Sequence, residues 1–154
     1  MRSPESPYEV IVEGRLAQGA LQHVWQSRCS DEFDLVLICA SEIEILPEGN
    51  KIVIPFADST DGVPDSIVHM LNAILYDAAF YDMNVLTICH MGENRSGFAS
   101  AIYLMQNAIL RGDFSYSAED AISLIREKVS PLTDNPYTLW NEGFVKQLKE
   151  MDNG

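Results

Sequence analysis

Short apolar runs constrain the fold of this chain more than any other feature of its sequence. Leu35–Ala40 reads LVLICA without a polar interruption, and residues 52–54 and 85–88 form two further runs with the residue types of strands. A continuous apolar run fits a strand that is covered on both faces, as in a parallel sheet between layers of helices. The sequence therefore predicts a mainly parallel central sheet.

Segments with helical spacing alternate with these runs. Apolar residues recur at helical intervals, or stand between capping signals, over residues 19–28, 64–81, 96–112, 117–131 and 135–148. Asn135-Pro136 has the pattern of an N-cap followed by proline, which places the start of the last helix there. We predict an α/β domain over residues 8–154, with flanking helices, a helical C-terminal half and a flexible tail at residues 1–7.

Composition and charge narrow the classes of partner. The net charge of −13 disfavours nucleic acid and anionic membranes, and no apolar run approaches the length of a membrane helix. The start of the chain is polar and proline-rich, unlike a signal peptide. Three cysteines and three histidines without ligand-like spacing predict a reduced, cytoplasmic protein that binds no metal.

The segment TICHMGENRSG joins the run at 85–88 to an apolar helical pattern. Cys89 ends the strand, a short glycine-containing loop leads to Arg95, and the helical pattern begins near Ser96. The amides of such a loop and the positive end of the helix dipole form an anion site, and the arginine fork suits two phosphate oxygens. The same field stabilises a thiolate, so Cys89 is a candidate nucleophile for phosphorus.

Phosphoryl transfer to a thiolate also needs an acid for the leaving oxygen. Asp58 follows the run at 52–54, with Asp61 and Asp65 further along the same loop. Loops at the carboxyl ends of neighbouring parallel strands meet at one edge of a sheet, so Asp58 can face Cys89. Asp61 competes for this role, and Asp58 could instead serve only as a turn residue.

With these residues in view, Cys89-x5-Arg95-Ser96 resembles the signature of the cysteine-dependent protein phosphatases, specifically their dual-specificity branch. Residues 15–19 are similar to the family's early strand, residues 55–58 to its general-acid loop, and residues 141–144 with Gln147 to its final helix. The resemblance covers nearly the whole chain. It implies a protein-tyrosine-phosphatase-like fold.

The resemblance also implies roles for individual residues. Cys89 would be the nucleophile, Asp58 the acid and then the base, and Ser96 the donor that helps the thiolate leave. Phosphate would be bound by Arg95 and by the backbone amides of the loop: His90, Met91, Gly92, Glu93 and Asn94. No cofactor or metal is implied. Cys39 would be a redox partner that captures oxidised Cys89, or else an ordinary buried cysteine.

Two positions depart from the family's pattern. The family usually has histidine immediately before the nucleophile, and Ile88 removes that hydrogen-bonding partner. Glu93 stands where small or neutral residues are common, and we expect its side chain to point outward. Together with Asp58, Asp61 and Asp65 it would make the mouth of the site acidic. This predicts poor turnover of phosphoinositides and 5′-phosphorylated RNA.

The sequence thus favours a phosphomonoesterase that acts on phosphotyrosine, phosphoserine or phosphothreonine in proteins through a phosphocysteine. The alternative is a phosphate-binding module with little or no turnover, suggested by Ile88 and Glu93. An RNA 5′-phosphatase or a phosphoinositide phosphatase is disfavoured by the charge balance.

Overall fold

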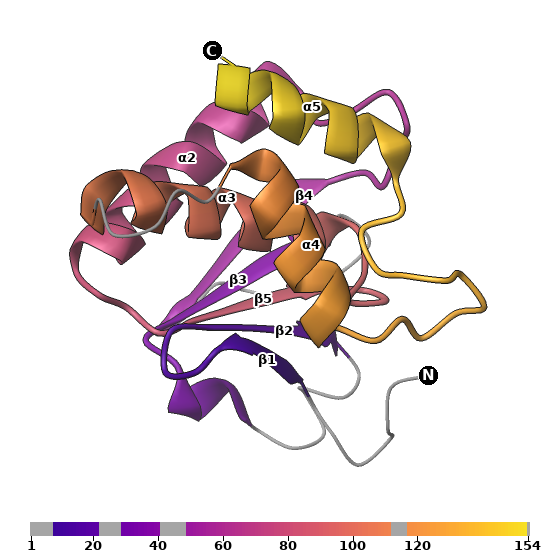
Figure 1. Ribbon diagram of the computed structural model, residues 1–154. Helices are drawn as coiled ribbons and strands as arrows, with labels where there is room; N and C mark the ends of the chain where they lie inside the picture. The colour runs from indigo at the N-terminus through magenta and orange to yellow at the C-terminus, as the bar shows by residue number, and fades with distance from the viewer. Residues whose placement is uncertain (1–7, 22–28, 41–48, 112–116, 154) are drawn as a thin grey trace.

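The structure is a computed structural model, and it describes residues 8–21, 29–40, 49–111 and 117–153 (Figure 1). Within these residues one sheet has the strand order β1-β2-β5-β3-β4. β1 is antiparallel to β2, and the other neighbouring pairs are parallel, which confirms the mainly parallel sheet. The strands are β1 Glu9–Val12, β2 Leu16–Ala20, β3 Leu35–Ala40, β4 Lys51–Phe56 and β5 Val85–Cys89.

The helices gather mainly on one side of this sheet. Figure 1 shows α2 to α5 above the sheet and the short 3-10 helix η1 below it. The helices are η1 Cys29–Glu32, α2 Asp65–Phe80, α3 Arg95–Arg111, α4 Ala118–Lys128 and α5 Glu142–Asn153. Helices flanking the sheet and a helical C-terminal half are both confirmed.

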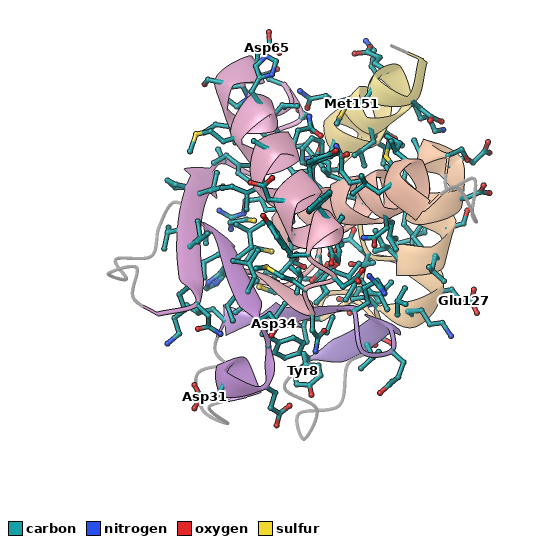
Figure 2. All side chains as sticks on the ribbon, turned by 90° about the vertical axis from the view of Figure 1, so that its left-hand side faces the viewer. Tyr8, Asp31, Asp34, Asp65, Glu127 and Met151 are labelled. Atoms are coloured by element: carbon teal, nitrogen blue, oxygen red, sulfur yellow. The ribbon has the colours of Figure 1, made fainter. Side chains whose placement is uncertain are left out.

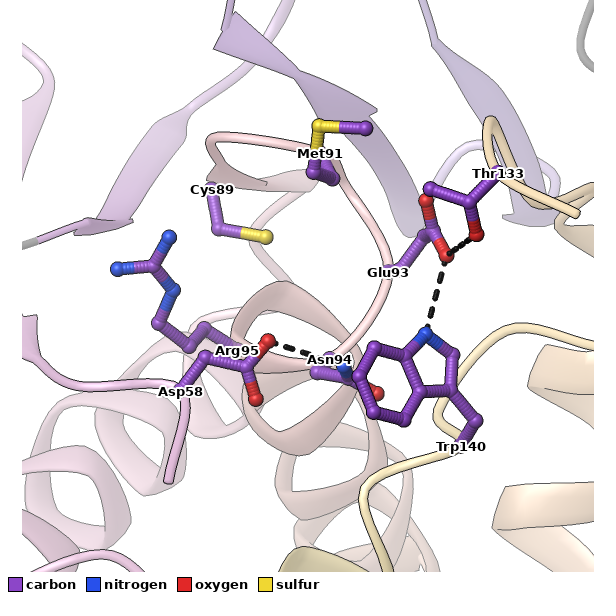
Figure 3. A pocket seen from close by; sticks show the side chains of 8 residues that line it. All are labelled: Asp58, Cys89, Met91, Glu93, Asn94, Arg95, Thr133 and Trp140. Atoms are coloured by element: carbon purple, nitrogen blue, oxygen red, sulfur yellow. Dashed lines mark hydrogen bonds between the residues drawn. The ribbon is translucent and has the colours of Figure 1, made fainter. Parts of the chain in front are cut away.

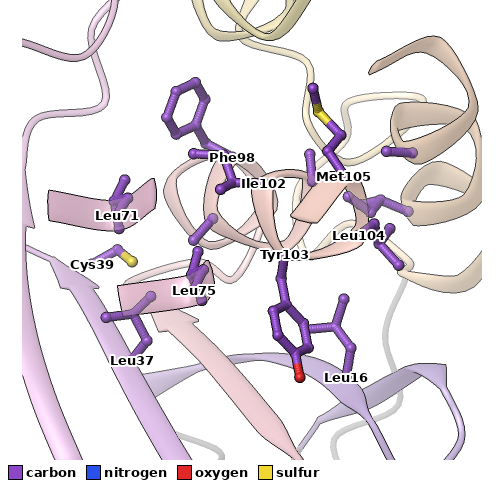
Figure 4. Close-up of a cluster of buried hydrophobic side chains, with 14 of the residues drawn as sticks. Leu16, Leu37, Cys39, Leu71, Leu75, Phe98, Ile102, Tyr103, Leu104 and Met105 are labelled. Carbon is purple, nitrogen blue, oxygen red and sulfur yellow. The ribbon is translucent and has the colours of Figure 1, made fainter. Parts of the chain in front are cut away.

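Two apolar clusters lie on opposite faces of the sheet. On β5, Val85 and Cys89 belong to the larger cluster beneath the helices, whereas Leu86 and Ile88 belong to the smaller one on the other face. Side chains fill the space between the sheet and α2 to α5 (Figure 2), and Figure 4 shows part of that core. The burial of β5 on both faces explains why its sequence lacks the alternation of a half-exposed strand.

Three aromatic rings tie the end of the sheet to two helices. Phe56 closes β4, Phe98 lies on α3 and Phe144 lies on α5. Their ring centroids are 5.3–6.2 Å apart, within the range of favourable aromatic contact. The segment after β4, the start of α3 and the start of α5 are therefore held together.

Two predicted helix boundaries were wrong. β2 continues to Ala20, so no helix begins at residue 19, and residues 22–28 of the predicted helix lie outside the described residues. Asn135-Pro136 does not begin the last helix, because residues 129–141 form an irregular segment and α5 begins at Glu142. Asn141 caps α5 instead: its Oδ1 accepts a hydrogen bond from the Phe144 amide at 3.1 Å.

Candidate active site

Strand, loop and helix place the thiol and the guanidinium as the sequence predicts. β5 ends at Cys89, residues 90–94 form a bend, and α3 begins at Arg95. Gly92 has a φ of +69°, a conformation that residues with a side chain rarely adopt. Cys89 is 2% exposed, and its Sγ lies 3.2 Å from the Oγ of the buried Ser96.

The Cys89 thiol and the Arg95 side chain both line a small cavity of about 50 Å³ (Figure 3). The predicted acid, nucleophile and clamp all line it. The lining residues are Asp58, Cys89, Met91, Glu93, Asn94, Arg95, Thr133 and Trp140. His90 is exposed and not part of the lining, and neither Asp61 nor Asp65 lines the cavity. Of the three candidate acids, the structure therefore brings only Asp58 to the thiol.

Arg95 reaches the end of β4 from the first turn of α3. It is 8% exposed, and its Nη1 donates a long hydrogen bond of 3.4 Å to the carbonyl oxygen of Phe56. Phe56 precedes the loop that carries Asp58. One side chain thus connects the segment after Cys89 to the segment that holds the candidate acid.

Two asparagines hold the carboxylate of Asp58. Asn94 Nδ2 donates to Oδ2 at 3.0 Å, and Asn141 Nδ2 donates to Oδ1 at 2.7 Å. The two asparagines also contact each other, since Asn94 Oδ1 accepts from the Asn141 amide at 3.0 Å. Both are buried, whereas Asp58 itself is exposed. Local sequence patterns predict no side-chain role for either asparagine, because the two lie far apart in the chain.

The loop after Asp58 is fixed by the first turns of α5. A Cβ atom added to Gly143 would lie 2.1 Å from the carbonyl oxygen of Thr60, so only glycine permits this approach. Gln147 accepts from the Val63 amide at 2.8 Å and donates to the Val63 carbonyl at 2.7 Å. The family-like residues at the start of the last helix therefore position the loop of the candidate acid.

Glu93 corrects an expectation drawn from the sequence. Its side chain does not point outward: the residue is 2% exposed. The carboxylate accepts hydrogen bonds from Thr133 Oγ1 at 3.0 Å and Trp140 Nε1 at 3.2 Å (Figure 3), and from the Leu132 amide at 3.2 Å. These donors hold the carboxylate inside the protein. Glu93 thus fastens the segment before α5 to the loop after Cys89.

The backbone of Glu93 adds to this attachment. Its carbonyl oxygen accepts from the Leu139 amide at 3.1 Å and from Thr138 Oγ1 at 3.2 Å. Leu139 has a φ of +56°, unusual for a residue with a side chain, and is fully buried. The irregular path of the segment before α5 is therefore set by its contacts with the loop after Cys89. Local sequence patterns do not reveal such contacts.

The loop after Cys89 also has support from β2. Gln18 is buried, and its Nε2 donates to the Gly92 carbonyl oxygen at 2.9 Å. Sequence reasoning missed this contact, although a glutamine within a buried strand is itself a signal. Ile88, the residue that departs from the family's histidine, packs in the smaller cluster on the other face of the sheet.

Cys39 lies on the strand beside β5. The parallel register pairs Ile38 with Ile88, and Cys39 and Cys89 both belong to the larger apolar cluster. Both are free thiols. Burial raises the pKa of Cys39 well above its ordinary value, and the neighbouring Cys89 raises it further, whereas Arg95 lowers it. The two thiols thus share one face of adjoining strands.

Within residues 8–21, 29–40, 49–111 and 117–153, no cluster of three or more histidine, cysteine or acidic side chains forms a metal site. Over the same residues no helix has the length and apolar character to cross a membrane.

No protein-family model and no curated protein sequence matches this chain. Solved structures do match it. OH1 from the Orf virus, a tyrosine phosphatase with triple substrate specificity, has a TM-score of 0.69 at 20% identity, covering 95% of this chain and 86% of its own. Human DUSP28 has a TM-score of 0.66 at 16% identity, covering 96% and 94%.

A third structure, PTPMT1 in complex with PI(5)P, has a TM-score of 0.66 at 18% identity and covers 96% of both chains. The three structures thus match nearly the whole of this chain at low sequence identity. The chain therefore has the fold of the dual-specificity and protein tyrosine phosphatases.

Proposed function

We propose that this protein is a phosphomonoesterase that removes phosphate from phosphotyrosine, phosphoserine or phosphothreonine in proteins. The observation that carries the proposal is the meeting of Asp58, Cys89 and Arg95 around one small cavity. The fold shared with known phosphatases adds support. A thiol, a guanidinium and a positioned carboxyl group are the parts that phosphocysteine chemistry needs.

In the first step the phosphate of the substrate occupies the cavity. The loop amides of residues 90–95 and the Arg95 guanidinium bind its oxygens, and the helix dipole of α3 adds to their attraction. Cys89 attacks phosphorus as a thiolate, an S–P bond forms, and the bond to the leaving oxygen breaks. Asp58 gives its proton to that oxygen.

In the second step a water molecule attacks the phosphocysteine. Asp58, now a carboxylate, takes a proton from the water, and the S–P bond breaks to release inorganic phosphate. Ser96 Oγ, 3.2 Å from the sulfur, donates a hydrogen bond to the departing thiolate. The clamp formed by Asn94 and Asn141 keeps Asp58 beside the cavity through both steps.

A phosphate-binding module with little turnover is the second candidate, and Ile88 favours it. Ile88 is fully buried in an apolar cluster, so it offers no polar group to the loop after Cys89. Against this, Gln18 supports the same loop through the Gly92 carbonyl. The held carboxylate of Asp58 also has no evident purpose in a module that only binds. We therefore favour the enzyme.

Hydrolysis of p-nitrophenyl phosphate by the wild type and by Cys89→Ser separates the two candidates. If the protein is an enzyme, the wild type hydrolyses p-nitrophenyl phosphate and Cys89→Ser does not. Binding of a phosphopeptide by a wild type that releases no phosphate would instead support the module. Faster release of phosphate from phosphoinositide vesicles or 5′-phosphorylated RNA than from phosphopeptides would contradict a protein substrate.

A further inference from the structure

A second, larger hollow lies beside the catalytic cavity. Its volume is about 450 Å³, against about 50 Å³ for the cavity that holds Cys89. The hollow lies between α4, the segment before α5 and the outer face of α5, and we call it the α5 groove. It is lined by Arg126, Tyr137, Trp140, Glu142, Val145, Lys146, Lys149 and Glu150.

Trp140 belongs to both spaces, so the α5 groove adjoins the catalytic cavity directly. The hydrogen bond from its Nε1 to Glu93 fixes the indole. Trp140 is 37% exposed and forms a wall that the two spaces share. A substrate whose phosphate fills the cavity can therefore place neighbouring parts of its chain over Trp140 and toward the groove.

The charge of the α5 groove is opposite to that of the protein. The whole chain has 10 lysines and arginines against 23 acidic residues. Three of those cations line the groove, together with only two of the acidic residues, Glu142 and Glu150. A local excess of positive charge on a protein of net charge −13 is a place where an anionic group can bind.

The cations of the groove are not neutralised by close ion pairs. Arg126 donates to the carbonyl oxygens of Thr138 at 3.4 Å and Leu139 at 3.0 Å, and it stacks over the Tyr137 ring. These partners carry no charge.

Lys146 has only a long contact of 3.9 Å with Glu150, and the pair is exposed to solvent. Lys149 forms no ion pair with any residue that the structure describes. The charges of Arg126 and Lys149 therefore have no acidic partner among the described residues, and that of Lys146 has only this long, exposed one.

We propose that the α5 groove binds acidic side chains next to the phosphorylated residue of a peptide substrate. This inference rests on the proposed function and specifies it: the enzyme would prefer phosphorylation sites in acidic sequences. The phosphate would lie on the loop after Cys89, the peptide would cross Trp140, and a nearby aspartate or glutamate would meet Lys146 and Lys149.

A peptide fits these observations better than a membrane surface. The protein as a whole is strongly acidic, so an anionic bilayer would repel it and oppose the attraction of the groove. The groove also combines cations with the exposed rings of Tyr137 and Trp140, and aromatic residues and arginine are common where proteins bind other proteins.

The test measures binding to Cys89→Ser, which cannot turn the substrate over, so it does not depend on the proposed activity. Two fluorescent phosphotyrosine peptides of equal length are compared by anisotropy, one with aspartates on both sides of the phosphotyrosine and one with asparagines. We expect the acidic peptide to bind about threefold to tenfold more tightly, with a preference that weakens as salt is added.

The double variant Lys146→Gln/Lys149→Gln, in the Cys89→Ser background, should lose this preference. Its affinity for the asparagine peptide reports any general damage to binding. Lys128→Gln removes an exposed cation of α4 that does not line the groove, so it should keep the preference.

Equal affinity of the two peptides would overturn the proposal, as would a preference that survives the double substitution. Tighter binding to phosphoinositide vesicles than to the acidic peptide, lost with the same two lysines, would also overturn it. Failure of the wild type to hydrolyse p-nitrophenyl phosphate would count against the proposed function alone.

Discussion

The side-chain amide of Asn141 donates a hydrogen bond of 2.7 Å to the carboxylate of Asp58, across 83 residues of sequence. The same asparagine caps α5, because its Oδ1 accepts from the Phe144 amide. One side chain thus couples the start of the last helix to the candidate general acid. The position of Asp58 therefore depends on a residue in the C-terminal half of the chain.

Asn141→Asp should impair the acid while keeping the helix cap. Aspartate is also a good N-cap, but its second oxygen would place a negative charge where the amide donated to Asp58. The two carboxylates would repel each other, so Asp58 should lose the position that the Asn141 side chain gives it beside the cavity. We expect kcat to fall about tenfold to a hundredfold for substrates with poor leaving groups.

Asn141→Ser is the matched control for this charge. Serine also caps a helix and removes the amide without adding a carboxylate. It should lower kcat less than Asn141→Asp does, because no second carboxylate would face Asp58. Equal kcat values for Asn141→Asp and the wild type with an alkyl phosphate would show that Asn141 does not influence the acid.

Gly143→Ala should displace the loop that carries the acid. The added Cβ would lie 2.1 Å from the carbonyl oxygen of Thr60 and 2.7 Å from its carbonyl carbon, so the backbone must move. Overpacking of this kind costs about 1–3 kcal/mol of unfolding free energy. Denaturant unfolding should show this loss, and alkyl phosphates should lose more activity than p-nitrophenyl phosphate, whose leaving group needs little protonation. An unchanged midpoint of unfolding would contradict the close approach.

Glu93→Gln should destabilise the protein. The carboxylate of Glu93 accepts three hydrogen bonds, and the amide of glutamine would turn an NH₂ group toward one or more of those donors. Leaving a buried donor unsatisfied costs about 1–3 kcal/mol, which chemical denaturation can measure. Glu127→Gln, an exposed change on α4, is the control and should have almost no effect. Equal losses in the two variants would refute the anchoring role of Glu93.

Cys39 should capture oxidised Cys89. Peroxide converts the Cys89 thiolate to a sulfenic acid, and attack by the Cys39 sulfur forms a disulfide with loss of water. Because burial raises the pKa of Cys39, few molecules carry its thiolate near neutral pH, and the rate of capture should increase as the pH rises. Peptide mass spectrometry after mild peroxide should find the Cys39–Cys89 linkage. Irreversible oxidation of Cys89 at the same rate in wild type and Cys39→Ala would disprove the pairing.

The sequence predicted those parts of the molecule that local patterns encode. The apolar run at Leu35–Ala40 and the strand that ends at Cys89 have the predicted places, because continuous apolar strands are buried on both faces. The loop from Cys89 to Arg95 was also predictable, since strand, glycine-containing loop and helix follow directly in the chain. Asp58 was harder to place, and only the structure separates it from Asp61.

The remaining features depend on contacts between distant segments. Asn135-Pro136 has the local pattern of a helix start. The segment around it instead donates hydrogen bonds to the side chain and the carbonyl oxygen of Glu93, and the helix begins only after Asn141. The predicted outward orientation of Glu93 was wrong for the same reason: the donors to its carboxylate come from residues 132–140, far away in the sequence. No periodicity or spacing rule encodes such partners.

The most direct test of the account is the mass of the peptide that contains Cys89 during turnover. Wild-type protein and Asp58→Ala are mixed with p-nitrophenyl phosphate, stopped rapidly under denaturing conditions and digested. The account predicts that one phosphoryl group is attached to Cys89, that Asp58→Ala accumulates more of it because the second step is slowed, and that Cys89→Ser has none. Release of p-nitrophenol without a phosphoryl group on Cys89, or with one on another residue, would contradict the account.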